Sequence, residues 1–312
     1  MERNKGKTSK GIILVLILLT ISLSILLYFT YNEYLEYNNI LKDNKGLNSK
    51  INILNKEYTK ELDIKKELEY NENTLNNIEE EIIKLKEEVF SLASKLEDKI
   101  TNSESNYKIA YLTFDDGPYL STNEVLDILD KYKIKATFFT IGLDKDICYD
   151  NNNYSCAETY KKEVDLGHTI ANHTYTHAIF RGLYNSTTSF ISDVKRQETL
   201  IEERTGVKTN IVRFPGGSST ARGLKESIIN ELRNLGYGWV DWTANDGDGG
   251  YLPNTTVAWN NFTNSINENI EVVLFHDYSN ITISILPKAI EYLQNNNYIL
   301  LPLFYNSIKV NK

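Results

Sequence analysis

Cysteine, histidine and proline are scarce in this chain of 312 residues, which has only two, four and five of them. The two cysteines, Cys148 and Cys156, cannot build a disulfide framework, and they lack the second pair that a zinc finger needs. Outside the cell these two thiols could close a single loop. Basic residues number 34 against 42 acidic ones and form no patch with interleaved aromatics, so nucleic acid is not an expected partner.

One uncharged run is long enough to cross a membrane. Residues 11–30 carry no charge, and twenty helical residues span roughly the 30 Å hydrocarbon core of a bilayer. Residues 1–10 hold four basic side chains and one acidic one, so we expect this tail to stay cytoplasmic. A cleaved signal peptide is the alternative, but no small-residue cleavage site follows the run. The sequence therefore predicts a single-pass protein of the cell membrane, with the remainder of the chain extracellular.

Residues 31–105 have the composition of a long helix, because they contain no proline and one glycine, Gly46. Two rows of apolar residues recur at heptad spacing, one with Leu75, Ile82 and Val89 and the other with Ile78, Leu85 and Leu92. Such rows predict a coiled-coil stalk through which the chain could self-associate. A single amphipathic helix folded back on the rest of the protein is the alternative.

From residue 106 to residue 312, short apolar runs alternate with amphipathic segments. The runs predict strands over 110–114, 136–141, 168–171, 210–214, 237–241, 271–275 and 298–303. Ser121 and Glu124 have the spacing of a capping box before one of the predicted helices. Strands alternating with helices indicate an α/β domain, and the even repetition favours a distorted (β/α) barrel of about seven parallel strands over an open sheet.

Polar side chains stand where the predicted strands end. Asp115 and Asp116 follow the first strand, and His173 and His177 follow the third. The fourth, fifth and sixth strands end with Arg213, Asp241 and His276. Because the carboxyl ends of parallel strands meet on one face of a barrel, we expect these side chains to share one site.

The spacing of His173 and His177 would place two imidazoles on one side of a helical turn. With an added carboxylate they form a set of two histidines and one acid that leaves positions open for water and substrate, as catalytic metal sites do. The sequence therefore predicts one divalent metal ion. Zinc is the ion we expect, although other transition metals suit the same ligands.

Five segments, in this order, resemble the motifs of the NodB-homology polysaccharide deacetylases, carbohydrate esterase family 4. They are TFDDGP (113–118), NHTYTH (172–177), RFPGG (213–217), DWTANDGD (241–248) and LFHD (274–277). The similarity covers roughly residues 107–303. It implies a metal-dependent hydrolase that removes N-acetyl groups from the sugars of a polysaccharide.

The resemblance also implies roles for single residues. Asp115 matches the family's catalytic base, and Arg213 matches the arginine that holds this base in place. Asp116, His173 and His177 match the metal ligands.

Three further matches concern the substrate and the leaving group. His276 matches the general acid, the backbone N–H of Gly216 matches an oxyanion contact, and Leu274 matches the apolar wall around the acetyl methyl group.

The fourth motif departs from the family's pattern, in which a tryptophan follows an aspartate. Here Gly249 follows Asp248, and Trp242 lies six residues before Asp248. We assign Asp248 to orient His276, with Asp241 as the rival, and Trp242 to the wall of the substrate groove.

Peptidoglycan is the polymer we expect, because an anchor with a stalk of roughly 70 helical residues reaches about 100 Å from the membrane. That reach suits a large immobile wall. Chitin-like, poly-glucosamine or xylan polymers are alternatives within the same chemistry. A wall-binding scaffold without activity is a different alternative, but a scaffold would not need the complete set of polar residues.

The anchor is tested by fractionating cells that produce a C-terminally tagged protein. We expect the full-length chain in the membrane fraction, since residues 11–30 are uncharged and follow a basic tail. Recovery from the medium of a product that starts near residue 31 would contradict the anchor and indicate a signal peptide.

Overall fold

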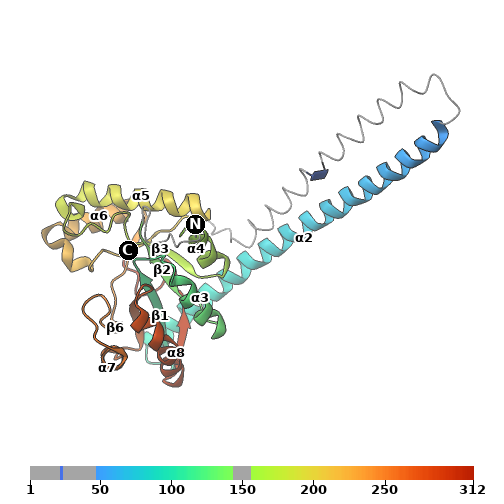
Figure 1. The fold of residues 1–312 in the computed structure, drawn as a ribbon. Coiled ribbons are helices and arrows are strands. Elements are labelled where there is room, and N and C mark those ends of the chain that lie inside the picture. Colours follow the sequence, from blue (N-terminus) through green and yellow to red (C-terminus); the bar gives the residue numbers. More distant parts are fainter. Residues whose placement is uncertain (1–21, 24–46, 143–155) are drawn as a thin grey trace. The chain divides into compact units, whose positions relative to one another are not determined.

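The computed structural model describes residues 22–23, 47–142 and 156–312 (Figure 1). Within these residues, no helix is both long enough and apolar enough to traverse a bilayer. Apart from positions 22–23, the anchor predicted for residues 11–30 lies outside the described residues, so it stays a prediction. Cys148 also lies outside them, and the disulfide with Cys156 stays a prediction too. Backbone contacts separate two compact units, and the larger contains Lys86–Lys312.

A single helix, α2 (Leu47–Thr101), extends over 55 residues. Its sequence contains no glycine or proline, so no residue interrupts the backbone hydrogen bonds. The helix predicted over 31–105 is therefore confirmed for residues 47–101, whereas residues 31–46 lie outside the described part of the chain. The apolar residues Leu85, Val89 and Leu92 remain exposed on it, and the coiled coil with a second chain stays a prediction.

The last turns of α2 belong to the larger unit and pack against the rest of it. Phe90 stacks on Phe304 with ring centres 4.9 Å apart. Glu97 is 2% exposed, and its Oε1 accepts hydrogen bonds from the hydroxyl of Tyr111 and from the backbone N–H of Ile308. A buried carboxylate needs such donors, so these turns of the helix are fitted to the base of the domain.

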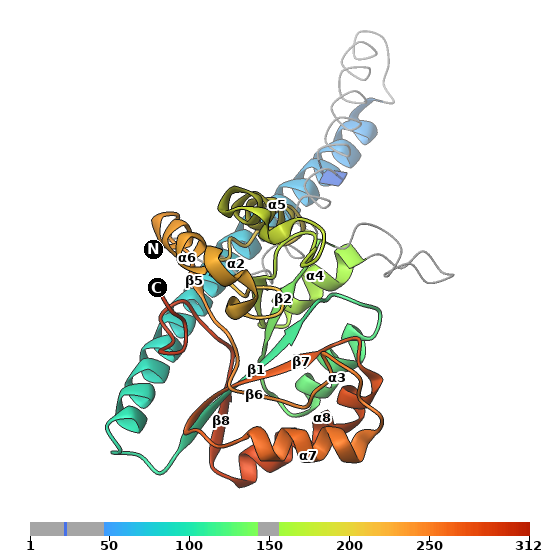
Figure 2. The same cartoon turned by 90° about the vertical axis from the view of Figure 1, so that its left-hand side faces the viewer.

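The larger unit contains one parallel sheet. Its strands are β1 (Lys108–Asp115), β2 (Thr137–Thr140), β3 (Thr169–Asn172), β4 (Ile211–Val212), β5 (Gly238–Trp239), β6 (Ala244–Asn245), β7 (Ile270–His276) and β8 (Tyr298–Leu301). Seven strands follow the order β5-β4-β3-β2-β1-β7-β6, and β8 pairs with the first half of β1. The sheet curls into a half-barrel, as Figure 2 shows, and no ladder joins β5 to β6 within the described part of the chain.

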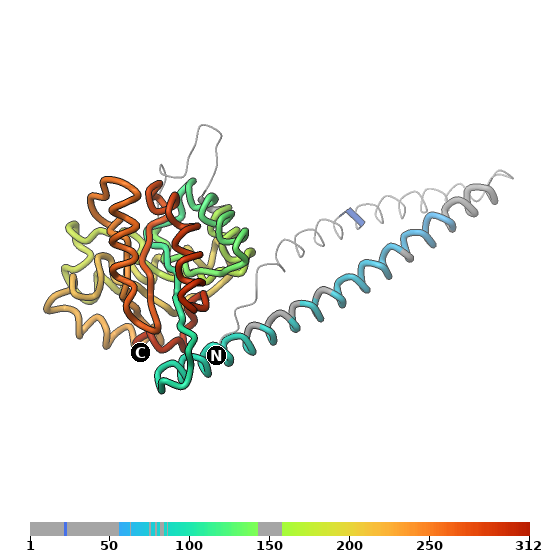
Figure 3. The backbone as a smooth tube through the Cα atoms, turned by 90° about the horizontal axis from the view of Figure 1, so that it is seen from below, coloured from blue at the N-terminus to red at the C-terminus, as the bar shows by residue number. Residues whose placement is uncertain are grey.

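Helices surround the half-barrel in the same order as the strands. They are α3 (Thr122–Lys131), α4 (Cys156–Asp165), α5 (Thr187–Thr205), α6 (Lys225–Asn234), α7 (Thr255–Ser265) and α8 (Asn280–Asn295), with short 3-10 helices η1 (Leu183–Asn185) and η2 (Ser218–Leu224). Contacts join them in the sequence α6-α5-α4-α3-α8-α7, and α7 and α8 run side by side in Figure 3. The α/β class and all seven predicted strands are confirmed. The barrel is only half closed, and the two-residue strand β6 was not predicted.

The alternation of side chains along β1 separates two cores. Leu112 and Phe114 point outward into a cluster with α3 and α8, whereas Ile109 and Tyr111 point into the barrel. Burial of each such side chain contributes about 1.5–3 kcal/mol. Asp115 has the parity of Ile109 and Tyr111, so the same alternation directs its carboxylate into the barrel.

The capping box predicted before α3 is wrong. Ser121 has helical backbone angles (φ −65°, ψ −19°) and caps nothing with its side chain. Thr122, the first residue of α3, binds the preceding loop, because its Oγ1 accepts the backbone N–H of Tyr119 at 2.7 Å and donates its own proton to Asp277.

Replacement of Glu97 should destabilise the larger unit. Glu97→Ala removes the acceptor of the buried Tyr111 hydroxyl and of the part-buried N–H of Ile308, and a buried donor without an acceptor costs about 1–3 kcal/mol. We expect urea unfolding to show a loss of about 2–4 kcal/mol. Glu97→Gln retains an acceptor and should lose less, and Glu88→Ala, at an exposed position of the same helix, should change little. A Glu97→Ala protein as stable as the Glu88→Ala protein would contradict the structural role of this contact.

Candidate active site

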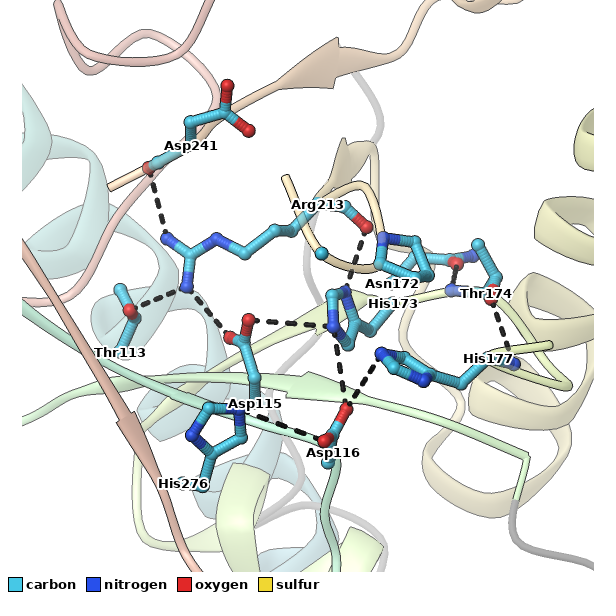
Figure 4. A network of polar contacts seen from close by, with 12 residues as sticks. Thr113, Asp115, Asp116, Asn172, His173, Thr174, His177, Arg213, Asp241 and His276 are labelled. Atoms are coloured by element: carbon cyan, nitrogen blue, oxygen red, sulfur yellow. Dashed lines mark hydrogen bonds and ion pairs between the residues drawn. The ribbon is translucent and has the colours of Figure 1, made fainter. Parts of the chain in front are cut away.

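The predicted polar residues meet at the carboxyl ends of the strands (Figure 4). Asp115 is the last residue of β1 and lies opposite His276, the last residue of β7. His173 and Arg213 each follow the final residue of their strands, β3 and β4, which pair at Asn172 and Val212. The predicted convergence on one face of the barrel is therefore confirmed.

Arg213 is fully buried, and each of its three guanidinium nitrogens donates at least one hydrogen bond. Its Nη1 donates to Asp115 Oδ1 and to Thr113 Oγ1, both at 2.7 Å. Its Nε and Nη2 donate to the carbonyls of Val240 and Asp241 at 3.2 and 3.3 Å. Complete pairing of this kind is what makes a buried charge tolerable.

Asp115 stands in an environment with opposing effects on its pKa. Burial raises the pKa of this carboxyl above its ordinary value, and the charge of Arg213 opposes the rise. A carboxylate with a raised pKa is a stronger base, and its bond to Arg213 fixes its orientation.

His173 is neutral and has one nitrogen free. Burial, followed by the nearby charge of His177, lowers the pKa of His173 to about 3. Its Nδ1 lies 2.9 Å from the carbonyl oxygen of Arg213, which can only accept, so Nδ1 carries the proton. The lone pair of Nε2 is therefore available to a cation.

The helical turn predicted for residues 173–177 is wrong, because this segment forms a bend. Thr174 and His177 adopt positive φ angles of 65° and 48°, which are uncommon outside glycine and turn the chain sharply. Asp193 of α5 supports the bend by accepting the backbone N–H and the hydroxyl of Thr176. The two imidazoles converge through this bend.

Asp116, His173 and His177 have the geometry of a metal-binding set. Their ligand atoms all lie within 4.8 Å of one another. Asp116 Oδ1 is 3.5 Å from Nε2 of His173 and 3.3 Å from Nε2 of His177. Ligands about 2.0–2.1 Å from a tetrahedral ion are about 3.3 Å apart, so the spacing fits. Among the described residues no donor hydrogen-bonds this buried oxygen, which leaves it for a cation.

His276 is held by Asp248. Asp248 Oδ1 lies 2.7 Å from His276 Nδ1, and its Oδ2 accepts the backbone N–H of His276 at 2.8 Å. Burial lowers the pKa of His276, but the hydrogen bond and charge of Asp248, with Asp115 and Asp116, outweigh it and raise the pKa to about 9. The imidazole is therefore a cation at neutral pH, with its Nε2 3.7 Å from Asp116 Oδ2.

Asp241, the rival of Asp248, is engaged elsewhere. It accepts hydrogen bonds from the backbone N–H and the hydroxyl of Ser218 at 2.8 and 2.6 Å.

Two partners of Asp248 were not predicted from the sequence. Thr282 donates to Asp248 and to Asp246, and burial, then the charge of Asp248, raises the pKa of Asp246 to about 7.

The remaining predicted residues lie on the backbone around these polar groups. Leu274 is buried two residues before His276 on β7 and shares its side of the strand. Gly216 follows Arg213 by three residues and has a φ of 71°. Trp242 packs against Gly217, where an added Cβ would lie 3.1 Å from its ring. The roles predicted for all these residues stay predictions.

The sequence profile described as polysaccharide deacetylase matches residues 102–240. A peptidoglycan-N-acetylglucosamine deacetylase of Bacillus cereus is 32% identical over 197 residues, which are 61% of this chain and 67% of that protein. The chain belongs to the polysaccharide deacetylase family. The family of enzymes predicted from the five motifs is therefore confirmed. The chain spans about two thirds of the length of the Bacillus cereus protein.

Two further relatives of this polysaccharide deacetylase differ in their named activities. A bifunctional xylanase/deacetylase of Pseudobutyrivibrio xylanivorans is 31% identical over 206 residues, which are 64% of this chain and 30% of that protein. The catalytic domain of a peptidoglycan N-acetylglucosamine deacetylase from Eubacterium rectale has a similar structure, with a TM-score of 0.58 and 32% identity. That match covers 66% of this chain and 93% of the domain.

Metal analysis of the purified polysaccharide deacetylase should find one divalent ion per chain. In His173→Ala we expect the affinity for the ion to fall by about 100-fold or more, since loss of a mere supporting residue costs 10–100-fold. His168→Ala is the control, because this buried histidine precedes β3 at the opposite end of the strand and accepts the N–H of Ala136. Full metal occupancy in His173→Ala would refute the assignment.

Proposed function

We propose that the protein is a metal-dependent deacetylase that hydrolyses the N-acetyl groups of a cell-wall polysaccharide, most of all peptidoglycan. One observation carries the proposal. Asp115, held by Arg213, and His276, held by Asp248, flank the same metal-binding set, at 3.5 Å from His173 and 3.7 Å from Asp116 respectively. A base and an acid on two sides of one reaction centre are what amide hydrolysis requires.

Amide hydrolysis is slow because the carbonyl is a poor electrophile and the amine a poor leaving group. A divalent ion held by Asp116, His173 and His177 would polarise the carbonyl and lower the pKa of water. Zinc is the ion we propose, since two imidazoles and one carboxylate with an open position suit it. The ligands present in the chain fit that assignment.

The protein's own side chains then move two protons. Asp115 accepts a proton from the water that attacks the acetyl carbon, and Arg213 keeps its carboxylate oriented while it does so. The backbone N–H of Gly216 donates to the oxygen on which negative charge develops. His276, a cation at neutral pH, donates its proton to the departing nitrogen as the carbon–nitrogen bond breaks. Acetate and a free amine on the sugar are the products.

The choice of peptidoglycan is supported by the relatives from Bacillus cereus and Eubacterium rectale, whose names specify it. It is also supported by the predicted layout of a cytoplasmic tail (1–10), a membrane anchor (11–30), a helical stalk (31–105) and a catalytic domain (106–312), which would hold the site outside the cell near the wall. The xylanase/deacetylase relative keeps xylan as an alternative, beside chitin-like and poly-glucosamine polymers.

The substrate is tested by measuring acetate release from a panel of polymers with the purified full chain. We expect release from peptidoglycan, with less from chitin, poly-N-acetylglucosamine and acetylated xylan. No release from any of them by metal-loaded protein would contradict the proposal and favour a wall-binding scaffold.

Asp115 and Asp116 are adjacent and identical but should respond differently to the same change. In Asp115→Asn the metal should remain and turnover should fall by about 10²–10⁴-fold, the usual contribution of a positioned proton-transfer group. In Asp116→Asn the metal should be lost, because a neutral amide oxygen is a poorer ligand. Metal content and acetate release measured on both proteins separate the roles. Metal loss confined to Asp115→Asn would mean that the two roles are reversed.

A further inference from the structure

The tryptophan that follows the aspartate in the fourth motif of the family pattern is absent here. Gly249 takes that position directly after Asp248. A Cβ added to Gly249 would lie 3.3 Å from His276 Cε1, so residue 249 directly adjoins the imidazole. A sugar that approaches His276 therefore finds no aromatic side chain at residue 249.

Another aromatic residue lies beside the same imidazole. The ring centre of Tyr278 is 5.1 Å from that of His276, and the two planes are tilted by 38°. Tyr278 is 38% exposed, so it covers the histidine on one side and presents surface to solvent on another. It comes from the turn between β7 and α8, in which Ser279 donates its backbone N–H to the carbonyl of His276.

Tyr119 supports Tyr278 from the loop after β1. Their rings meet edge to face, with centres 5.3 Å apart and planes at 68°. The two loops are tied together below the rings, because Thr122 accepts the backbone N–H of Tyr119 and donates to Asp277, the neighbour of Tyr278. Thr122 and Asp277 are both buried. The pair of rings is thus preorganised and needs no ordering when a ligand arrives.

Trp242 has a different neighbour. It packs against Gly217, in the segment that follows β4. Among the described residues, Tyr278 is the aromatic side chain whose ring pairs with that of His276.

The chemistry places the sugar next to that donor. A proton is delivered only over hydrogen-bond distance, about 3 Å, and the nitrogen that receives it is attached directly to the pyranose ring. The pyranose ring must then lie beside His276, next to the partly exposed ring of Tyr278. The C–H groups of a pyranose are apolar and pack well against an aromatic ring.

We propose that Tyr278, backed by Tyr119, is the platform on which the pyranose ring of the reacting N-acetylglucosamine unit stacks, in place of the tryptophan absent at Gly249. This inference rests on the proposed function and adds the residue that selects a sugar over a simple acetyl compound.

The test compares two substrates of the metal-loaded full chain. One is the β-1,4-linked pentamer of N-acetylglucosamine, and the other is 4-nitrophenyl acetate, which has an acetyl group and no sugar. In Tyr278→Ala we expect kcat/KM for the pentamer to fall about tenfold relative to kcat/KM for the ester, chiefly through KM, because one aromatic contact is lost. Tyr278→Trp restores a ring and should keep the ratio within about threefold of the wild type.

Tyr107→Ala is the matched control. Tyr107 is also an exposed tyrosine, but it precedes the amino end of β1, whereas Asp115 ends the strand. An unchanged ratio in Tyr278→Ala would overturn the proposal. Equal losses on both substrates would also overturn it, since the ring would then act through His276. A wild-type protein that hydrolyses the ester but releases no acetate from the pentamer or any wall polymer would refute the proposed function itself.

Discussion

The buried ion pair between Arg213 and Asp115 is the contact on which the rest of the site depends. The guanidinium joins β1 to the segment after β5, because it also binds Thr113 and the carbonyls of Val240 and Asp241. The carbonyl of the same residue selects the tautomer of His173. Loss of one partner of a buried pair costs about 3–5 kcal/mol. The orientation of Asp115 therefore depends on the side chain of Arg213, and the tautomer of His173 depends on the backbone of the same residue.

The structure also explains how two neighbouring aspartates enter different environments. Asp115 ends a strand, so the alternation along β1 points it into the barrel toward Arg213. Asp116 has left the strand with a φ of 72°, which turns its carboxylate toward the two imidazoles instead. A change of backbone conformation over one residue thus separates a carboxylate paired with arginine from a carboxylate free for a cation.

The sequence predicted what depends on periodic patterns. Apolar runs and their polar ends located the seven strands and placed Asp115, Arg213 and His276 on one face. It did not predict features that depend on a single backbone angle or a long-range distance. The bend between His173 and His177 needs two positive φ angles. Asp248 was assigned to His276 from the family pattern, with Asp241 as the rival. Only the packing shows that Asp248 contacts His276 whereas Asp241 binds Ser218. Asp246 and Thr282 carried no signal of their own.

Gly249 has a consequence for selective inhibition. Residue 249 directly adjoins the imidazole, because a Cβ added there would lie 3.3 Å from His276 Cε1. A metal-chelating inhibitor with a bulky substituent directed over Gly249 would meet no side chain of that residue here, whereas a tryptophan at the matching position of a family member would obstruct it. The missing side chain therefore marks a position at which a compound could distinguish this deacetylase from such relatives.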